Sequence, residues 1–127
     1  MSGILIVDDN HSQREQLKAI LSDAGYPVIG SAGSGTEAVR LLRSINPTMV
    51  TLDLVMPDMN GLDLLRSIRA AYPAIPVMVC SSFGHEVVAD LARRSGAFAF
   101  FAKPYPAVRL LEEVERIIGP PATSISV

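Results

Sequence analysis

Five side chains that could carry out phosphoryl chemistry are spread along this chain of 127 residues. They are three carboxylates, one hydroxyl and one ammonium, at Asp8, Asp9, Asp53, Ser81 and Lys103. Carboxylates that lie close together repel one another, and a divalent cation such as Mg²⁺ together with a lysine neutralises that repulsion. A carboxylate in such a setting can attack a phosphoryl group and form an aspartyl phosphate. The residue types therefore predict a site for a divalent cation, at which such an attack is possible, provided that the fold brings them together.

Each of these residues follows or closes a short apolar run. The runs cover residues 4–7, 49–52, 77–80 and 98–101. Runs of this composition are typical of strands that are buried on both faces, as in a parallel sheet. The carboxyl ends of parallel strands lie along one edge of the sheet, where open α/β proteins bind their ligands. We therefore expect the five side chains to converge on one patch at that edge.

The segments between the runs have the apolar spacing of helices, so strand and helix alternate five times along the chain. A second short strand is expected around Val28-Ile29, and Gly25 stands where the first helix should end. Residues 34–37 have the pattern of a capping box and predict a helix that continues through Ile45. This alternation predicts an α/β fold with a doubly wound, five-stranded parallel sheet of the flavodoxin-like kind.

The later helices are predicted over about residues 60–72, 85–95 and 106–118. The helix over 85–95 has the thinnest apolar stripe, and we expect it to bury Val87, Val88 and Leu91. Gly119-Pro120-Pro121 should break the last helix. We therefore expect one domain over residues 1–119, followed by a flexible tail or the start of a linker over residues 120–127.

The pattern resembles the receiver domain of two-component response regulators, of the chemotaxis single-domain type. The resemblance runs from residue 4 to about residue 118, and the matching pieces are Asp8-Asp9, residues 53–61, Ser81 and Lys103-Pro104. It implies a phosphorylation-dependent signalling switch that catalyses its own phosphoryl transfer and slow dephosphorylation but is not a turnover enzyme. A sensor histidine kinase or a phosphotransfer protein would donate the phosphoryl group from a phosphohistidine to Asp53.

The resemblance also implies how the metal is bound. Mg²⁺, or Mn²⁺ in its place, would be held directly by Asp9, by Asp53 and by the backbone carbonyl of Val55. Asp8 would act on the metal largely through water. Lys103 would place its ammonium on one phosphoryl oxygen.

Further roles implied by the resemblance concern the response to phosphorylation. The Ser81 hydroxyl would contact a phosphoryl oxygen, and Phe100 would swing inward as that contact forms. The bond before Pro104 would be a cis peptide. Gly61 would allow a positive φ in the loop after Asp53. A downstream protein partner would bind the face formed by the fourth helix, the fifth strand and the fifth helix.

The sequence departs from chemotaxis-type members at two positions that should flank the phosphoryl group. Val55 and Phe83 are apolar here, whereas those members carry polar residues. Hydrolysis needs a water in line with the phosphorus, and polar side chains can orient it. We therefore expect slow self-dephosphorylation.

Composition excludes several other classes of protein. The net charge is −2 and no run of basic residues exceeds Arg93-Arg94, which argues against nucleic-acid binding. The single cysteine, Cys80, cannot form an internal disulfide and is expected to be a buried, inert thiol in a reducing compartment. No apolar stretch reaches the length of a membrane span and there is no signal peptide, so a cytoplasmic protein is expected. It should be a monomer or a weak, phosphorylation-dependent dimer.

Three alternatives follow from the same residues. A phosphatase with an aspartyl nucleophile commonly carries a second Asp two residues later, where this chain has Val55. A flavodoxin-like cofactor carrier should have a glycine-rich turn after the first strand, where this chain has Asp8-Asp9. A receiver-like scaffold that is never phosphorylated would not need the intact acidic set. Taken singly, Asp8-Asp9 could also be a helix N-cap and Lys103 a surface lysine.

Overall fold

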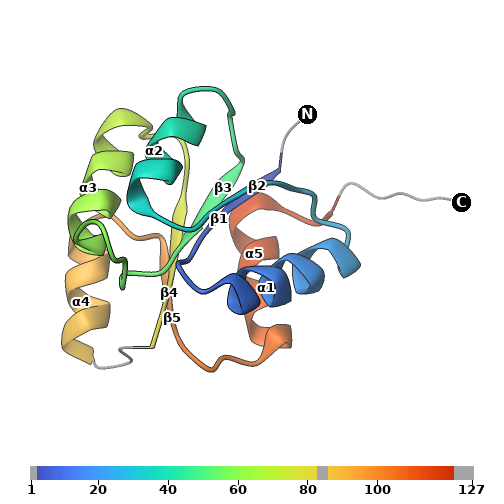
Figure 1. The fold of residues 1–127 in the computed structure, drawn as a ribbon. Coiled ribbons are helices and arrows are strands. Elements are labelled where there is room, and N and C mark those ends of the chain that lie inside the picture. Colours follow the sequence, from blue (N-terminus) through green and yellow to red (C-terminus); the bar gives the residue numbers. More distant parts are fainter. Residues whose placement is uncertain (1–2, 83–85, 122–127) are drawn as a thin grey trace, which may run out of the picture.

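A computed structural model describes residues 3–82 and 86–121 of the chain. Within these residues it contains one sheet of parallel strands in the order β2-β1-β3-β4-β5 (Figure 1). The strands are β1 (Ile4–Val7), β2 (Val28–Ala32), β3 (Met49–Leu52), β4 (Val77–Ser81) and β5 (Ala99–Ala102). The first and third strands have the predicted bounds, whereas β2 continues three residues further and β5 is shifted by one residue.

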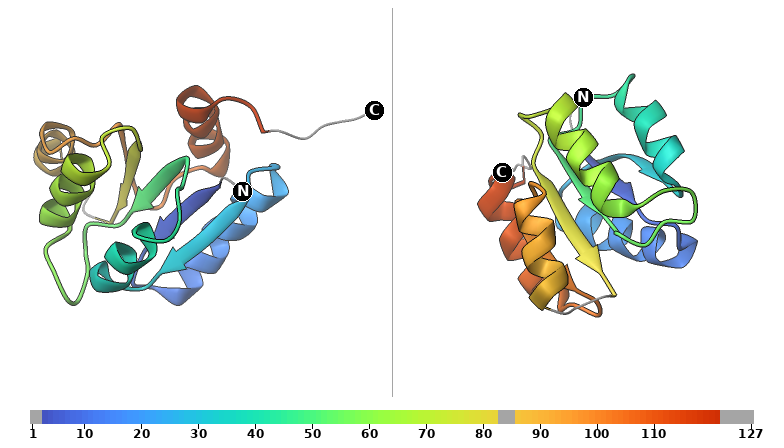
Figure 2. Two further views of the ribbon diagram at one scale, coloured as in Figure 1. Left: turned by 90° about the horizontal axis from the view of Figure 1, so that it is seen from above. Right: turned by 90° about the vertical axis from the view of Figure 1, so that its left-hand side faces the viewer.

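Helices cover both faces of this sheet. They are α1 (His11–Asp23), α2 (Gly35–Leu42), α3 (Gly61–Ala71), α4 (Glu86–Arg94) and α5 (Ala107–Ile118). Helices α1 and α5 pack on one face, and α2, α3 and α4 pack on the other (Figures 1 and 2). No helix in the described part of the chain is long and apolar enough to cross a membrane. The arrangement confirms the predicted doubly wound, flavodoxin-like fold.

The core is divided into two clusters by the sheet. Alternate residues of β1 belong to different clusters, with Leu5 and Val7 facing α2, α3 and α4, and Ile4 and Ile6 facing α1 and α5. Every side chain of β1 is therefore at most 1% exposed. Burial on both faces is the reason that the strands are unbroken apolar runs.

The helix ends follow the predicted signals only in part. Gly25 follows α1 with a φ of 94°, as a C-terminal glycine should. At the start of α2, Ser34 Oγ accepts a hydrogen bond from Glu37 N at 3.1 Å. The Glu37 carboxylate instead accepts from Gly33 N at 2.8 Å, so the reciprocal half of the capping box is shifted by one residue. Helix α2 also ends at Leu42, three residues before the predicted Ile45.

The prediction for the buried face of α4 was wrong. The helix buries Ala89 and Ala92 and leaves Val87 and Leu91 70% and 41% exposed, with Val88 half-buried. Two rows of apolar residues at helical spacing run along α4 and could face the sheet. One contains Val87, Val88 and Leu91, and the other contains Ala89 and Ala92. The small alanine side chains let a helix approach the sheet closely, and the larger residues are consequently left on the outer surface.

The reason given for Gly61 was also wrong. Among the described glycines a positive φ occurs at Gly25, Gly96 and Gly119, whereas Gly61 is the first residue of α3. A Cβ atom at Gly61 would lie 2.2 Å from the carbonyl oxygen of Leu54. The position therefore requires glycine because two backbone segments meet there, which holds the loop after β3 against α3.

Candidate functional site

The carboxyl ends of β1, β3 and β5 bring the predicted acidic and basic residues together. Asp8 follows β1, Asp53 follows β3 and Lys103 follows β5. Backbone hydrogen bonds continue past the strands, from Asp53 N to Val7 O at 2.9 Å and from Lys103 N to Ser81 O at 2.8 Å. The sheet itself therefore fixes the backbone of the site.

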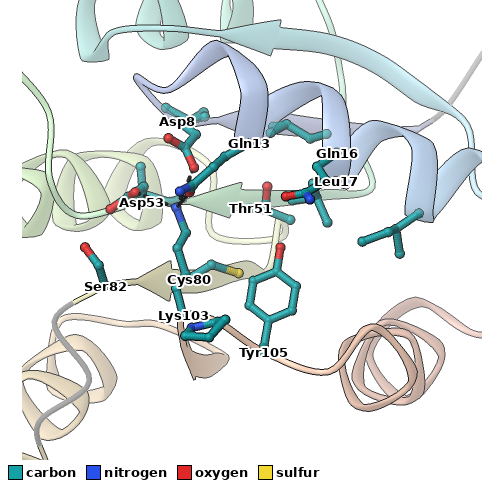
Figure 3. A pocket seen from close by; sticks show the side chains of 15 residues that line it. Asp8, Gln13, Gln16, Leu17, Thr51, Asp53, Cys80, Ser82, Lys103 and Tyr105 are labelled. Atoms are coloured by element: carbon teal, nitrogen blue, oxygen red, sulfur yellow. Dashed lines mark hydrogen bonds and ion pairs between the residues drawn. The ribbon is translucent and has the colours of Figure 1, made fainter.

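Lys103 joins the two buried carboxylates (Figure 3). Its Nζ atom lies 2.6 Å from Asp8 Oδ2 and 2.8 Å from Asp53 Oδ2, and the three side chains are between 7% and 12% exposed. The ammonium also donates to Gln13 Oε1 on α1. Its three protons are thus all used.

The charge of Lys103 is maintained by these partners. Burial of the ammonium lowers the pKa of Lys103, but the hydrogen bonds and negative charges of Asp53 and Asp8 outweigh that effect and leave the pKa above its ordinary value. The lysine is accordingly a permanent cation in the site. The alternative of a surface lysine is excluded.

Each buried carboxylate is also held by the backbone through its second oxygen. Asp8 Oδ1 accepts from Asn10 N at 2.9 Å, and Asp53 Oδ1 accepts from Val55 N at 2.9 Å. The N-cap of α1 is Asn10, whose side chain accepts from Gln13 N, so the acidic pair is not the helix cap. Both carboxylates are therefore oriented from two directions.

The acidic residues fit a divalent cation. Carboxylate oxygens of Asp8, Asp9 and Asp53 all lie within 4.8 Å of one another, with Asp9 exposed and the other two buried. Three carboxylates and one ammonium leave two negative charges uncompensated among these four side chains. Hard cations such as Mg²⁺ and Mn²⁺ prefer such oxygen ligands together with water. Val55, which is 39% exposed, lies beside Asp53, and its carbonyl remains a predicted ligand.

The two serines at the end of β4 occupy different positions. Ser81 is the last residue of β4 and is fully buried, and its carbonyl accepts from Lys103 N. Ser82 is exposed and lies on the wall of the pocket (Figure 3). The sequence pointed to the hydroxyl of Ser81 alone, so Ser82 is a second hydroxyl at the site that it missed. The role of Ser81 stays a prediction.

Phe100 lies on β5, three residues before Lys103. It is half-buried and packs against the core cluster on the α2, α3 and α4 side. Together with Ala89 of α4 it also lines a cavity of about 500 Å³. The Lys103–Pro104 peptide is cis, as predicted. Phe83 lies outside the described residues.

Asp58 is a contact that the sequence did not reveal. It lies in the loop after Asp53 and accepts hydrogen bonds from Gly35 N at 3.0 Å, Thr36 N at 2.9 Å and Thr36 Oγ1 at 2.7 Å. Hydrogen bonds from the Thr36 side chain and backbone and from Gly35 lower the pKa of Asp58 to about 2. An acidic residue suits a helix N-terminus, and that preference is the only signal that could have suggested the contact.

The acidic site opens into a pocket of about 640 Å³ beside α1 (Figure 3). Its inner walls include Leu17, Thr51, Cys80 and Tyr105. Burial raises the pKa of the Cys80 thiol to about 12, so the thiol is protonated at neutral pH, in agreement with the expected inert cysteine. The other three side chains carry no sequence signal that singles them out.

Comparisons with known proteins match most of the chain. A family model described as the response regulator receiver domain matches residues 4–115. The chemotaxis protein CheY of Thermotoga maritima is 38% identical over 114 residues, which cover 90% of this chain and 95% of that protein. A protein-glutamate methylesterase/protein-glutamine glutaminase of Anaeromyxobacter dehalogenans is 42% identical over 118 residues, but these cover only 32% of that protein.

The fold is also similar to that of solved structures. A chain in the CheX-CheY-BeF3-Mg²⁺ complex from Borrelia burgdorferi superposes with a TM-score of 0.86. It is 31% identical and covers 92% of this chain, which covers 88% of it in turn.

Proposed function

Because this chain belongs to the response regulator receiver domain family and is a phosphorylation-dependent signalling switch, we propose that Asp53 is its phosphoryl acceptor. The supporting observation is the ion-pair network in which Lys103 Nζ lies 2.8 Å from Asp53 and 2.6 Å from Asp8. The donor would be a phosphohistidine of a sensor histidine kinase or of a phosphotransfer protein. Residues 1–119 would form the receiver unit.

The reaction requires a nucleophilic carboxylate and a means of offsetting charge. A carboxylate oxygen of Asp53 attacks phosphorus, the O–P bond forms as the P–N bond to the histidine breaks, and the released imidazole nitrogen takes a proton. Asp9, Asp53 and the Val55 carbonyl would hold Mg²⁺ or Mn²⁺, with Asp8 acting through water. When bound, the cation offsets negative charge on the phosphoryl oxygens.

Lys103 is the residue through which phosphorylation of Asp53 would affect β5. A phosphoryl group on Asp53 offers the ammonium a new charged acceptor, and ionic hydrogen bonds of this kind are the stronger ones. Lys103 follows β5, which also carries Phe100. Movement of the lysine toward the phosphoryl group therefore acts on the strand that holds the proposed switch aromatic. Ser81, whose carbonyl is bonded to Lys103 N, would supply the hydroxyl to another phosphoryl oxygen.

The output surface would be the face formed by α4, β5 and α5. Large apolar side chains are exposed on both helices, Val87 and Leu91 on α4 and Val108 on α5, and Phe98 is exposed directly before β5. All four are between 41% and 70% exposed. The cavity next to Phe100 lies between β5 and α4. If the Phe100 ring turned into this space, it would change the surface that a protein partner contacts. The protein itself would be a monomer or a weak, phosphorylation-dependent dimer.

Two other functions are less well supported. A phosphatase of this kind needs a general acid two residues after the acceptor. This chain has Val55 at that position, and a valine side chain cannot donate a proton. An unphosphorylated scaffold would have no use for three carboxylates within 4.8 Å of one another. We therefore propose a switch that turns over only its own phosphoryl group.

The test is phosphorylation by acetyl phosphate in the presence of Mg²⁺. Intact-protein mass spectrometry should show one added phosphoryl group, which Asp53→Asn abolishes. Asp63→Asn removes an exposed carboxylate from α3 and is the matched control. Undiminished phosphorylation of Asp53→Asn would show that Asp53 is not the acceptor.

A further inference from the structure

The inner part of the pocket beside α1 is formed by residues other than those proposed for phosphoryl transfer. The pocket, of about 640 Å³, runs from Asp53 and Lys103 to Tyr105 (Figure 3). Leu17 of α1 and Cys80 of β4 form apolar parts of its wall. Pockets of this size, lined mainly by apolar groups with a few polar ones, are typical of small-molecule sites.

A buried hydroxyl on this wall lacks a hydrogen-bond partner. Thr51, on β3, is 2% exposed and lines the pocket. Its Oγ1 atom has no partner among the described residues. A buried polar atom without a partner destabilises the folded protein, and such atoms are rare. The Oγ1 atom is itself covered, so a molecule in the pocket can be the missing partner only by displacing a neighbouring side chain.

Two further polar groups face the same space. The amide of Gln16 and the hydroxyl of Tyr105 point toward Thr51 across the pocket (Figure 3). The Tyr105 ring packs edge-on against Phe101 with ring centroids 6.1 Å apart, which holds its hydroxyl in place. Burial raises the pKa of Tyr105, so the phenol remains a hydrogen-bond donor at neutral pH. Two hydroxyls and an amide can together both donate to and accept from one ligand.

The neighbouring charges restrict the class of ligand. In the protein without bound metal, Asp8, Asp9 and Asp53 outnumber Lys103, so a carboxylate or phosphate ligand would be repelled. A free cation would lose its hydration against the apolar wall. We propose that the inner pocket binds a small uncharged molecule whose amide- or lactam-like group is hydrogen-bonded by Thr51, Gln16 and Tyr105. Its apolar body contacts Leu17 and Cys80.

The proposal is tested on the full, unphosphorylated chain by NMR titration. The probes are benzamide and 2-piperidone, which are neutral, and benzoate, which has the shape of benzamide but is an anion. The neutral probes should cause saturable shifts at Leu17, Thr51 and Tyr105, and benzoate should bind at least about tenfold more weakly. Thr51→Val and Tyr105→Phe keep the shape of the wall, and each should weaken benzamide binding about fivefold.

Two controls separate the pocket from the switch. Tyr72→Phe, at the end of α3, should leave binding unchanged. Thr51→Val and Tyr105→Phe should still be phosphorylated by acetyl phosphate, so failure of the pocket and failure of phosphoryl transfer are distinguished. Without a probe, Thr51→Val should unfold at a higher urea concentration than wild type, because it removes the unpaired hydroxyl.

Three results would overturn the proposal. The first is the absence of saturable shifts with both neutral probes. The second is equal benzamide binding by wild type and by the double variant Thr51→Val with Tyr105→Phe. The third is a loss of stability in Thr51→Val, since the hydroxyl would then have a partner within the protein.

Discussion

The two sides of the acidic site are held in different ways. On the β3 side, Asp53 is fixed by Val55 N, and the following loop is fastened to another helix. Asp58 in this loop accepts hydrogen bonds from Gly35 and Thr36 at the start of α2. The proposed phosphoryl acceptor is therefore part of a cross-linked unit made of β3, its loop and α2.

On the β5 side, the contacts that hold the site are exchangeable. The backbone of Lys103 is bonded to Ser81, but its side chain is held only by ionic and polar partners that a phosphoryl group can replace. Next to β5, helix α4 packs through alanines and exposes Val87 and Leu91. This side combines a replaceable network with an apolar surface.

The comparison indicates a division of labour within one small domain. A fixed acceptor would keep the geometry of phosphoryl transfer constant, whereas the Lys103 ammonium, which can change partners, would convert the new charge into movement. The following predictions test whether the two sides are separable, in order of decreasing effect.

Removing the positive charge of Lys103 should have the largest effect, and that effect is on stability. Lys103→Met leaves the buried carboxylates of Asp8 and Asp53 without their positive partner, and we expect a loss of about 3 kcal/mol or more of stability without metal. Added Mg²⁺ should recover part of that loss. Urea unfolding followed by circular dichroism measures both. Lys18→Met, at an exposed position of α1, is the control, and an equally small effect of both substitutions would contradict the buried network.

The same side chain should separate the chemistry from the response. In Lys103→Ala, Asp53 should still accept a phosphoryl group from acetyl phosphate with Mg²⁺, because its own carboxylate is unchanged. The amide signals of β5 and α4 should then shift much less than in the phosphorylated wild type. A full shift in this variant would mean that the lysine does not couple the two sides.

Metal affinity should depend on the exposed carboxylate. Asp9→Ala removes one of the few anionic ligands, and the affinity for Mg²⁺ should fall at least about tenfold, or about 1.4 kcal/mol. Isothermal titration calorimetry measures the affinity. Asp23→Asn, at the far end of α1, should bind the metal like wild type. Equal affinity in Asp9→Ala would rule out Asp9 as a ligand.

The hydrogen bonds between Asp58 and the start of α2 should make stability depend on pH. The pKa of Asp58 is lowered from 3.8 to about 2, so the folded state binds this proton more weakly than the unfolded state. The contribution of Asp58 is therefore complete above pH 3.8 and lost as the pH falls through about 2. Asp58→Asn should flatten the stability curve in that interval, and Thr36→Val should flatten it less. An unchanged curve in Asp58→Asn would show that the contact does not persist in solution.

The smallest effect is expected on the lifetime of the phosphorylated state. Val55→Asn supplies a polar group beside Asp53 that can orient a water, and together with Phe83→Glu it should shorten the lifetime several-fold. Loss of the phosphoryl group after removal of the donor measures this. A lifetime that is unchanged or longer in the double variant would remove apolar shielding as the explanation.

The residues that could be placed from the sequence are mainly those that follow the ends of strands. Asp8, Asp53 and Lys103 each come after an apolar run, and parallel strands necessarily place such residues on one edge. The bond before Pro104 and the start of α3 at Asn60-Gly61 were also foreseen. All of these follow from local sequence combined with one topology.

The features that the sequence did not predict depend on how helices, strands and loops that are far apart in the chain pack against one another. Asp58 contacts Thr36 across 22 residues of sequence, and nothing local indicates that partner. The outward position of Val87 and Leu91 depends on how closely α4 approaches the sheet. Thr51 was read as an ordinary strand residue, because an unpaired hydroxyl becomes visible only when its surroundings are known.

The hydrogen bond between Lys103 and Gln13 has a consequence for the sensitivity of the switch. An ammonium with three protons already in use cannot gain a phosphoryl oxygen without releasing Asp8, Asp53 or Gln13. Signalling is therefore an exchange whose equilibrium depends on the partner that is given up. A stronger acceptor at position 13 would hold the lysine in its resting arrangement, and a weaker one would bias it toward the activated arrangement. Gln13, on a helix outside the face formed by α4, β5 and α5, would thereby adjust the threshold of the response.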